Sequence, residues 1–264
     1  MLTSAAVSRR ALPYALIAPA VLLSAAVLLY PLVQAIRISL FRKVLGFPER
    51  FVGLANFRDL FADPQFLNSL GITFWWTLGS VIGQVLFGFG LALLLNHSFR
   101  GRAVYRTLFL LPWVLPNFIA ALTWVWMFND RFGIIPALLM GLGLVSHPVL
   151  FLADPTLTLG AVIAVNVWKN YAFVMIVMLA ALQAIPADLY ESARVDGASW
   201  LDEFRSITLP LVKPMLVIVV LLRLIWTFNT FELVFIMTEG GPGHSTEILT
   251  ITAFLQAFRG GVVG

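Results

Sequence analysis

The chain has 264 residues, of which 60% are hydrophobic and 11% are charged. A soluble globular domain contains about 45–50% apolar residues, so the composition excludes an ordinary water-soluble fold. The net charge of +4 comes from scattered basic residues, which in membrane proteins set topology more often than they bind nucleic acid. Cysteine is absent, which excludes disulfide bonds and cysteine-based metal or redox sites.

Long uncharged runs divide the chain into predicted membrane spans. About 20 residues of helix cross a hydrocarbon core, and a helix satisfies its own backbone hydrogen bonds in lipid. The first run has the basic flank of a signal peptide, but it is too long for one and is interpreted as a retained span. Buried helices of a large soluble protein would require more polar sequence. We therefore predict an all-α polytopic membrane protein with five spans, at residues 12–36, 69–95, 105–128, 157–184 and 213–238.

The segments between the spans alternate between the two faces of the membrane. The N-terminus, the 96–106 loop and the 186–212 segment share one face. Basic residues are divided almost evenly between the faces, so the positive-inside rule leaves the orientation open, although the short 96–106 loop favours the cytoplasm. Residues 1–264 are interpreted as a single transmembrane domain. The other face carries the segments 37–68, 129–156 and 239–264.

Prolines and glycines interrupt the apolar runs. Pro112 and Pro116 lie in the third run, and proline kinks a helix by removing a backbone donor. Small residues in membrane helices allow close packing. These features predict bends and close contacts without indicating a function. The glycines of the second run are Gly79, Gly83, Gly88 and Gly90.

One polar segment separates the fourth and fifth runs. Pro186 suits a first helical turn, and Gly197 tolerates the left-handed conformation that ends helices. Ser199 followed by Asp202 resembles a capping box, which starts a second helix. We expect two short helices around one turn, outside the membrane core, with Pro210 breaking the run. Such a pair could rest on the lipid surface or dock into the groove of a partner protein.

The same segment, ESARVDGA followed by ITLPLVKP, resembles the EAA motif of permease subunits of binding-protein-dependent ABC importers. VGLANFRDLF, LFLLPWVLP, VWKNYAFVMIVMLAALQAIP and FNTFELVFIMTEGGPGHSTEIL resemble the carbohydrate-uptake branch, which includes maltose and glycerol-phosphate permeases. The resemblance covers nearly the whole chain. Ser192 replaces an alanine of the family pattern, a small-for-small change. The residues implied to couple the chain to an ATPase are Glu191, Ser192, Ala193, Asp196, Gly197, Ala198, Leu209 and Pro210.

The resemblance implies that residues 187–206 form a cytoplasmic coupling helix in a cleft of an ATPase subunit. It thereby assigns the 186–212 segment to the cytoplasm. No lysine follows a glycine, so this chain lacks a P-loop, and we expect it to be no enzyme and to hold no cofactor. ATP and Mg²⁺ are expected on the partner ATPase.

The resemblance also implies partners and a location. We expect a second homologous permease in a heterodimer, an ABC ATPase dimer, an extracytoplasmic solute-binding protein and membrane lipid, but no nucleic acid. The implied location is the bacterial or archaeal cytoplasmic (inner) membrane, which the chain crosses several times. The family usually has a sixth span after the region that matches residues 253–264. Either the complete protein contains this span, which we expect, or the protein has five spans.

Polar groups inside the spans are candidates for a solute path, because charges within a membrane are expensive. Lys169 and Arg223 fit internal pairing with a helix end or a carboxylate. They also fit a sugar path in which Trp226 or Trp168 offers an aromatic face. The histidines are far apart in sequence, so we expect no metal site. The predicted path residues are Asn166, Lys169, Asn170, Tyr171, Trp226, Asn229 and Glu232.

The predicted function is the translocation subunit of an ATP-driven importer for a sugar or sugar-like solute. One alternative is a stand-alone secondary transporter or channel, which should show inverted repeats. Another is a membrane enzyme, which should gather catalytic residues at one face. Neither pattern is evident in the sequence.

Overall fold

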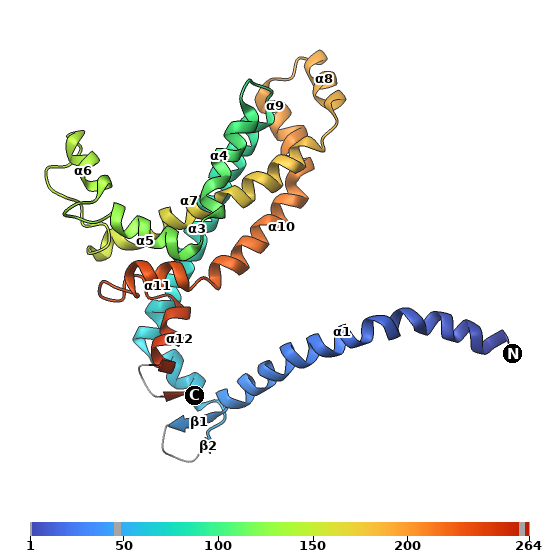
Figure 1. Cartoon of the computed structure of the whole chain (residues 1–264), viewed down its shortest axis with the longest axis vertical. Helices are drawn as coiled ribbons and strands as arrows, with labels where there is room; N and C mark the ends of the chain where they lie inside the picture. The colour runs from blue at the N-terminus through green and yellow to red at the C-terminus, as the bar shows by residue number, and fades with distance from the viewer. Residues whose placement is uncertain (1, 45–48, 259–261, 264) are drawn as a thin grey trace. The chain divides into compact units, whose positions relative to one another are not determined.

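A computed structural model describes the chain except for a few residues (Figure 1). The expected 37–68 and 239–264 segments are therefore described in part. The positions outside the described residues are 1, 45–48, 259–261 and 264.

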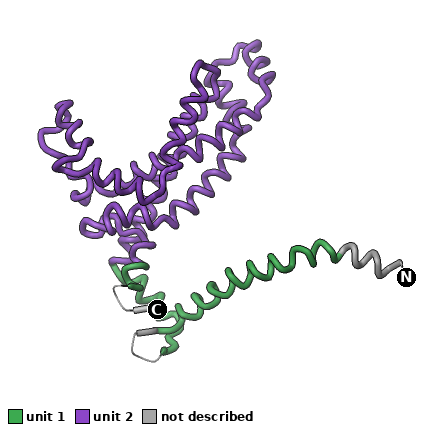
Figure 2. The backbone as a smooth tube through the Cα atoms, viewed as in Figure 1, with its two compact units in different colours: residues 1–64, 254–264 green, residues 65–253 purple. Residues whose placement is uncertain are grey.

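The chain forms two compact units, Met1–Pro64 with Phe254–Gly264, and Gln65–Ala253 (Figure 2). Most of its described residues are helical, as the all-α prediction requires. The helices are α1 (Leu2–Ser39), α2 (Ala55–Ala62), α3 (Pro64–Asn96), α4 (Arg102–Val114), α5 (Asn117–Met127), α6 (Ile134–Gly141), α7 (Pro155–Gln183), α8 (Ala187–Val195), α9 (Trp200–Glu203), the π-helix η1 (Phe204–Thr208), α10 (Leu209–Phe228), α11 (Glu232–Thr238) and α12 (Leu249–Phe258).

Four described helices are long and apolar enough to cross a membrane, and a bent pair makes a fifth span. The polytopic prediction is thus confirmed in its helical character and in the general position of its spans. The four continuous helices are Ala11–Ser39, Pro64–Asn96, Pro155–Gln183 and Trp200–Phe228.

The third expected span is not one straight helix. Its two halves, α4 and α5, meet at an angle of 94°. The break lies at Leu115 and Pro116, where Leu115 has the extended conformation that a following proline favours (φ −63°, ψ 137°). Because Pro116 also lacks a backbone donor, the last carbonyls of α4 have no helical partner there.

The fifth expected span begins earlier and ends earlier than predicted. Pro210 does not break the run, because α9, η1 and α10 continue as one helix from Trp200 to Phe228. The π-turn η1 precedes Pro210 and changes the hydrogen-bond register where the proline has no donor to give. The helix then ends at Phe228, and α11 is a separate short helix.

Glycines on one face of α3 allow close packing against α7. A Cβ added at Gly83 would lie 2.5 Å from Val167 Cγ2, and one at Gly88 would lie 2.6 Å from the Tyr171 carbonyl oxygen. Gly90 faces elsewhere, and an added Cβ would meet nothing within 4 Å. Close backbone approach of this kind holds helices together in lipid, where the surrounding solvent is as apolar as the side chains.

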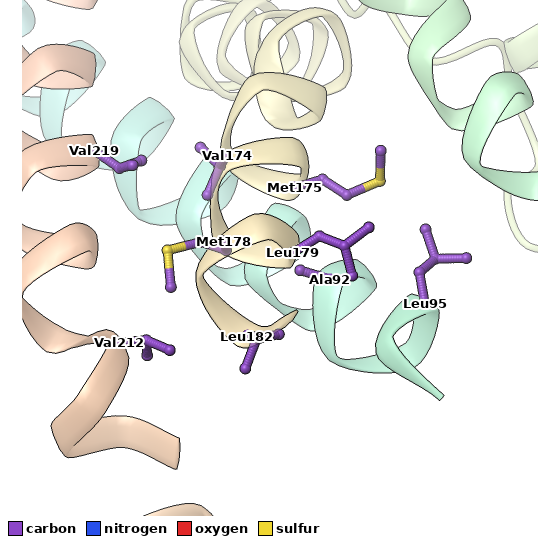
Figure 3. Packing of buried hydrophobic residues seen from close by; sticks show 9 residues of the cluster. All are labelled: Ala92, Leu95, Val174, Met175, Met178, Leu179, Leu182, Val212 and Val219. Carbon is purple, nitrogen blue, oxygen red and sulfur yellow. The ribbon is translucent and has the colours of Figure 1, made fainter. Parts of the chain in front are cut away.

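The core of the second unit joins α3, α7 and α10 (Figure 3). Two methionines of α7, Met175 and Met178, are fully buried at its centre, where unbranched side chains can fill irregular space. This core fixes α7 between the other two long helices. Its buried members are Ala92, Leu95, Val174, Met175, Met178, Leu179, Leu182, Val212 and Val219.

The start of α12 and the connection before it pack against the start of α3, where Gln65 Nε2 also donates to Glu247 Oε1 at 3.1 Å. The backbone N–H of Leu249 donates to Thr73 Oγ1 at 2.9 Å, and Thr252 Oγ1 donates to Ser69 Oγ at 2.8 Å. These contacts lie at the opposite end of α3 from Asn96. The α11–α12 connection is therefore at the opposite end of this unit from the residues that follow α3.

The first unit contains α1 and three short strands, β1 (Phe41–Val44), β2 (Arg50–Phe51) and β3 (Val262–Val263), which the all-α prediction did not include. The strands are antiparallel in the order β2-β1-β3. Asn56 of α2 donates to the carbonyl oxygens of Ser39 and Phe41, both at 2.9 Å. These bonds fix α2 beside the end of α1.

Replacing Gly88 with alanine should destabilise the fold. The added methyl has no room beside the Tyr171 carbonyl, and overpacking of this kind costs about 1–3 kcal/mol. We expect Gly88→Ala to lower the thermal unfolding midpoint of the purified chain in detergent. Gly90→Ala, in the same helix with open space around it, should leave the midpoint unchanged or raise it. Equal midpoints for the two variants would contradict the close α3–α7 packing.

Candidate functional site

The polar segment folds as a short helix, a glycine turn and a second helix start, as the sequence predicts. Helix α8 ends in a Schellman motif, in which Gly197 N–H donates to the Arg194 carbonyl and Ala198 N–H donates to the Ala193 carbonyl. Gly197 has φ +81°, a conformation that favours glycine. Ser199 then forms the expected capping box with Asp202 at the start of α9. We call α8, the turn and α9 the α8–α9 hairpin.

Two polar contacts fasten α8 to the long helix. Arg194 Nε donates to Glu203 Oε1 at 2.7 Å, and Arg194 Nη2 lies 3.4 Å from Glu203 Oε2. The Tyr190 hydroxyl lies 2.9 Å from Thr208 Oγ1 in η1. The hydrogen bond to Glu203, together with its charge, raises the pKa of Arg194 above the usual arginine value. Since Glu203 and Thr208 are buried, these contacts hold the hairpin in one orientation.

The outer surface of the hairpin is exposed and partly apolar. Val195 is 87% exposed and Trp200 is 63% exposed. Glu191 and Ser192 are exposed beside them, and Ala193 is half-buried. Figure 1 places α8 at one end of the second unit, beyond α4 and α9. Apolar side chains on a firmly held polar hairpin are suited to contact another protein.

The two remaining motif residues lie farther along the chain. Leu209 and Pro210 form the first turn of α10, after η1, and Pro210 is exposed. The structure therefore gathers the six motif residues that lie between positions 191 and 198 on the hairpin, and it places Leu209 and Pro210 at the base of the hairpin.

A cavity of about 700 Å³ separates the hairpin from the end of α3. Leu93, Leu94 and His97 line one side of it, and Tyr190 and Phe204 line the other. The hairpin therefore touches the rest of the unit through a few contacts rather than through a filled core.

A second cavity, of about 310 Å³, lies inside the helical bundle where two helices are broken. The α4–α5 break borders it on one side, and the α10–α11 break borders it on another. Irregular backbone at membrane depth is tolerated where it lines a cavity, and transporter sites are often built from such breaks. The lining residues are Trp113, Asn117, Asn166, Lys169, Asn170, Arg223, Trp226, Thr230 and Leu233.

Both buried cations of this cavity are held by neutral groups. Lys169 Nζ donates to the Trp113 carbonyl at 3.0 Å, at the end of α4. Arg223 Nε donates to Gln84 Oε1 at 2.6 Å, and its guanidinium lies 5.5 Å from the centre of the Trp226 ring. Lys169 is therefore paired with a helix end, as the internal-pairing interpretation predicts, whereas Arg223 is paired with an amide instead of a helix end or a carboxylate. Both cations also line the cavity.

The cavity brings together part of the predicted path. Asn166, Lys169, Asn170 and Trp226 line it, and Asn170 Nδ2 donates to Asn166 Oδ1 at 2.7 Å. The other predicted path residues are not among its lining residues.

Each of those other residues has a different position. Tyr171 packs its ring edge-to-face on Phe87. Asn229 is exposed and donates to the Ile225 carbonyl at the end of α10. Glu232 is exposed in the first turn of α11, and Trp168 packs against Trp124 instead of facing the cavity.

Several cavity residues were not predicted. Trp113 and Asn117 flank the α4–α5 break, and Thr230 lies in the α10–α11 break. The sequence signal for Trp113 and Asn117 was the polar Asn117 directly after Pro116 in an apolar run. The signal for Gln84, which holds Arg223, was a glutamine within the apolar stretch of α3 that runs from residue 81 to residue 95.

Comparisons with known proteins agree with this architecture. Residues 84–258 match the family of binding-protein-dependent transport system inner membrane components. The chain is 38% identical over 244 residues to the trehalose/maltose transport system permease protein MalF of Thermococcus litoralis, across 92% of this chain and 82% of that protein. It is 36% identical over 244 residues to the sulfoquinovosyl glycerol transport system permease protein SmoG of Agrobacterium fabrum, across 92% of this chain and 79% of that protein.

A solved structure is also similar. It is a bacterial alginate ABC transporter in complex with an alginate pentasaccharide-bound periplasmic protein. The TM-score is 0.82 at 25% identity, across 96% of this chain and 85% of that chain. These similarities support the permease prediction over a stand-alone transporter or channel. The chain belongs to the family of binding-protein-dependent transport system inner membrane components, and it is the membrane-spanning permease subunit of an ABC importer.

Proposed function

We propose that the α8–α9 hairpin couples this permease to a separate ABC ATPase. The observation that carries the proposal is a polar hairpin with exposed apolar residues, held rigidly by Arg194–Glu203 at the end of a membrane bundle. A surface that only rested on lipid would not require an arginine paired with a buried carboxylate to orient it. The EAA-like residues Glu191 to Ala198 all belong to this hairpin.

The ATPase is proposed to bind ATP and Mg²⁺ and to act as a dimer. When its two subunits close, the docked hairpin would move with them and tilt α7 and the Trp200–Phe228 helix as rigid rods. In this proposal the hairpin lies on the cytoplasmic face of the membrane. The chain crosses a bacterial or archaeal cytoplasmic membrane several times.

Two further partners complete the proposed importer. A second homologous permease would share the translocation path in a heterodimer. A solute-binding protein would meet the opposite face, which includes the α11–α12 connection. The family description and the alginate transporter, whose structure contains a periplasmic protein, support the contact with a solute-binding protein.

Replacing Gly197 with aspartate should abolish transport. Asp is among the residues that best tolerate positive φ, and an added Cβ at Gly197 meets nothing within 4 Å, so the chain should still fold. The new carboxylate would instead meet the ATPase surface. We expect loss of solute uptake by proteoliposomes, with either uncoupled ATP hydrolysis or loss of the ATPase subunit.

Gly143→Asp is the matched control. Gly143 also has positive φ (+70°) and open space, but it lies in the 129–156 segment. This variant should assemble and transport normally. Normal uptake by Gly197→Asp would show that the hairpin is not the coupling element.

We further propose that the solute is a sugar or sugar-like molecule that passes through the 310 Å³ cavity. Sugars need hydrogen-bonding groups beside apolar surface. Here Asn166 and Asn170 supply amides, and Trp226 supplies an aromatic face. The named solutes of the relatives, trehalose/maltose and sulfoquinovosyl glycerol, support a sugar-like class.

Replacing Trp226 with leucine should reduce uptake about tenfold, the effect of losing about 1.4 kcal/mol of aromatic contact. The measurement is uptake of maltose, trehalose and alginate oligosaccharides by the complete importer with its binding protein. Stimulated ATPase activity should change less than uptake, because the hairpin is intact.

Trp126→Leu provides the comparison. Trp126 is 69% exposed on α5 and does not line the cavity. Its replacement should leave uptake within about twofold, as is usual for exposed positions away from a site. If both tryptophan variants lost uptake equally, the cavity would not be the solute path.

A further inference from the structure

Two arginines of α4 converge on one amide. Arg102 is the first residue of α4 and Arg106 lies one turn later, so both side chains occupy one face of the helix. In the amide orientation that satisfies both, Gln183 Oε1 accepts from Arg102 Nη2 at 2.7 Å and from Arg106 Nη2 at 2.5 Å. Gln183 is the last residue of α7. The two arginines therefore connect the start of α4 to the end of α7, just before the hairpin.

The positive charge of this pair is not balanced within the described residues. None of their ion pairs joins Arg102 or Arg106 to a carboxylate. The Nε atoms of both arginines are buried and have no hydrogen-bond partner. One neutral amide oxygen cannot satisfy two guanidinium groups, each of which carries five N–H donors.

The local backbone adds to the imbalance. Arg102 and Arg106 lie in the first turns of a 13-residue helix, where the helix dipole disfavours cations and favours anions. Arg100 precedes them, and the 96–106 loop contains no acid. An anion at this point would interact favourably with both guanidinium groups and with the helix end.

The pair lies at the end of a predicted membrane span, where lipid headgroups are expected. The bent span begins at Arg102, and Arg106 is about 6 Å farther along the helix axis. Tyr105, between them, is 49% exposed, and tyrosine is enriched at membrane interfaces. Basic pockets between membrane helices at this level bind anionic lipid headgroups.

We propose that Arg102 and Arg106 form a binding site for the phosphate of an anionic phospholipid, between α4 and the end of α7. The site uses the guanidinium N–H groups that Gln183 leaves free. It is distinct from the α8–α9 hairpin and from the 310 Å³ cavity, because neither cavity includes Arg102, Arg106 or Gln183 in its lining.

The test uses the complete importer, stripped of lipid and titrated with phosphatidylglycerol or phosphatidylcholine, with bound lipid counted by native mass spectrometry. Wild type should retain phosphatidylglycerol preferentially. The double variant, Arg102→Gln with Arg106→Gln, should weaken phosphatidylglycerol binding about thirtyfold, because it removes two basic contacts near the membrane surface. Arg106→Lys keeps the charge and should retain most of the binding.

Arg100→Gln is the matched control, because Arg100 is exposed and makes no contact with Gln183. Its binding should stay within about twofold of wild type, as is usual for exposed positions away from a site. An unchanged unfolding midpoint for each variant shows that the fold is intact. If the double variant does not fold, the single variant Arg106→Gln decides the test. It should bind phosphatidylglycerol about fivefold more weakly than wild type, whereas Arg106→Lys should retain the binding.

Four results would overturn the proposal. The first is equal retention of the two lipids, and the second is undiminished phosphatidylglycerol binding by the glutamine variants. The third is displacement of the lipid by inorganic phosphate in solution, which would assign the site to a free anion. Loss of the ATPase subunit with lipid binding intact would likewise assign the arginines to a protein contact.

Discussion

Backbone groups inside a membrane must find partners within the protein, and this constraint shapes the bundle at its two breaks. The α4–α5 and α10–α11 breaks leave carbonyls that no helical N–H can reach. Side chains from elsewhere supply the missing donors. Lys169 donates to the Trp113 carbonyl, and Thr250 donates to the Thr230 carbonyl. Trp76 Nε1 adds a second donor to the Thr227 carbonyl at 3.1 Å, which a backbone N–H also reaches. The polar groups around the cavity therefore maintain the irregular backbone that creates it.

Helix α7 connects this arrangement to the α8–α9 hairpin. Lys169 contacts the α4–α5 break, while Gln183, about 21 Å farther along the helix, lies beside the start of α4. Its middle is clamped by the α3 glycines and by the Met175–Met178 core. A displacement at the hairpin end would thus be carried by a well-packed rod to the wall of the cavity. The 700 Å³ space under the hairpin leaves α8 free of extensive packing at the point where a partner would act.

The sequence predicts elements whose causes are local. The Gly197 turn and the Ser199 capping box depend on a few neighbouring residues, and both form as expected. Pro116 bends the chain as its chemistry requires, but the 94° angle depends on packing that no local pattern contains. The continuation of the helix past Pro210 required a π-turn, which propensity does not reveal. The pairing of Gln84 with Arg223 joins residues far apart in the chain, so only the fold could identify it.

The chemistry of the cavity also bears on how tightly a solute could be held. Lys169, Arg223 and the asparagine amides make its lining rich in hydrogen-bond donors, and no carboxylate belongs to it among the described residues. Each sugar hydroxyl can accept such bonds through its lone pairs, so contacts are available in many orientations. The strongest donors are already engaged, Lys169 by a carbonyl and Arg223 by Gln84, so a passing solute would have to share them. Shared donors give weak contacts, and weak contacts suit a path that must release its solute, because binding too strong at one site stops passage.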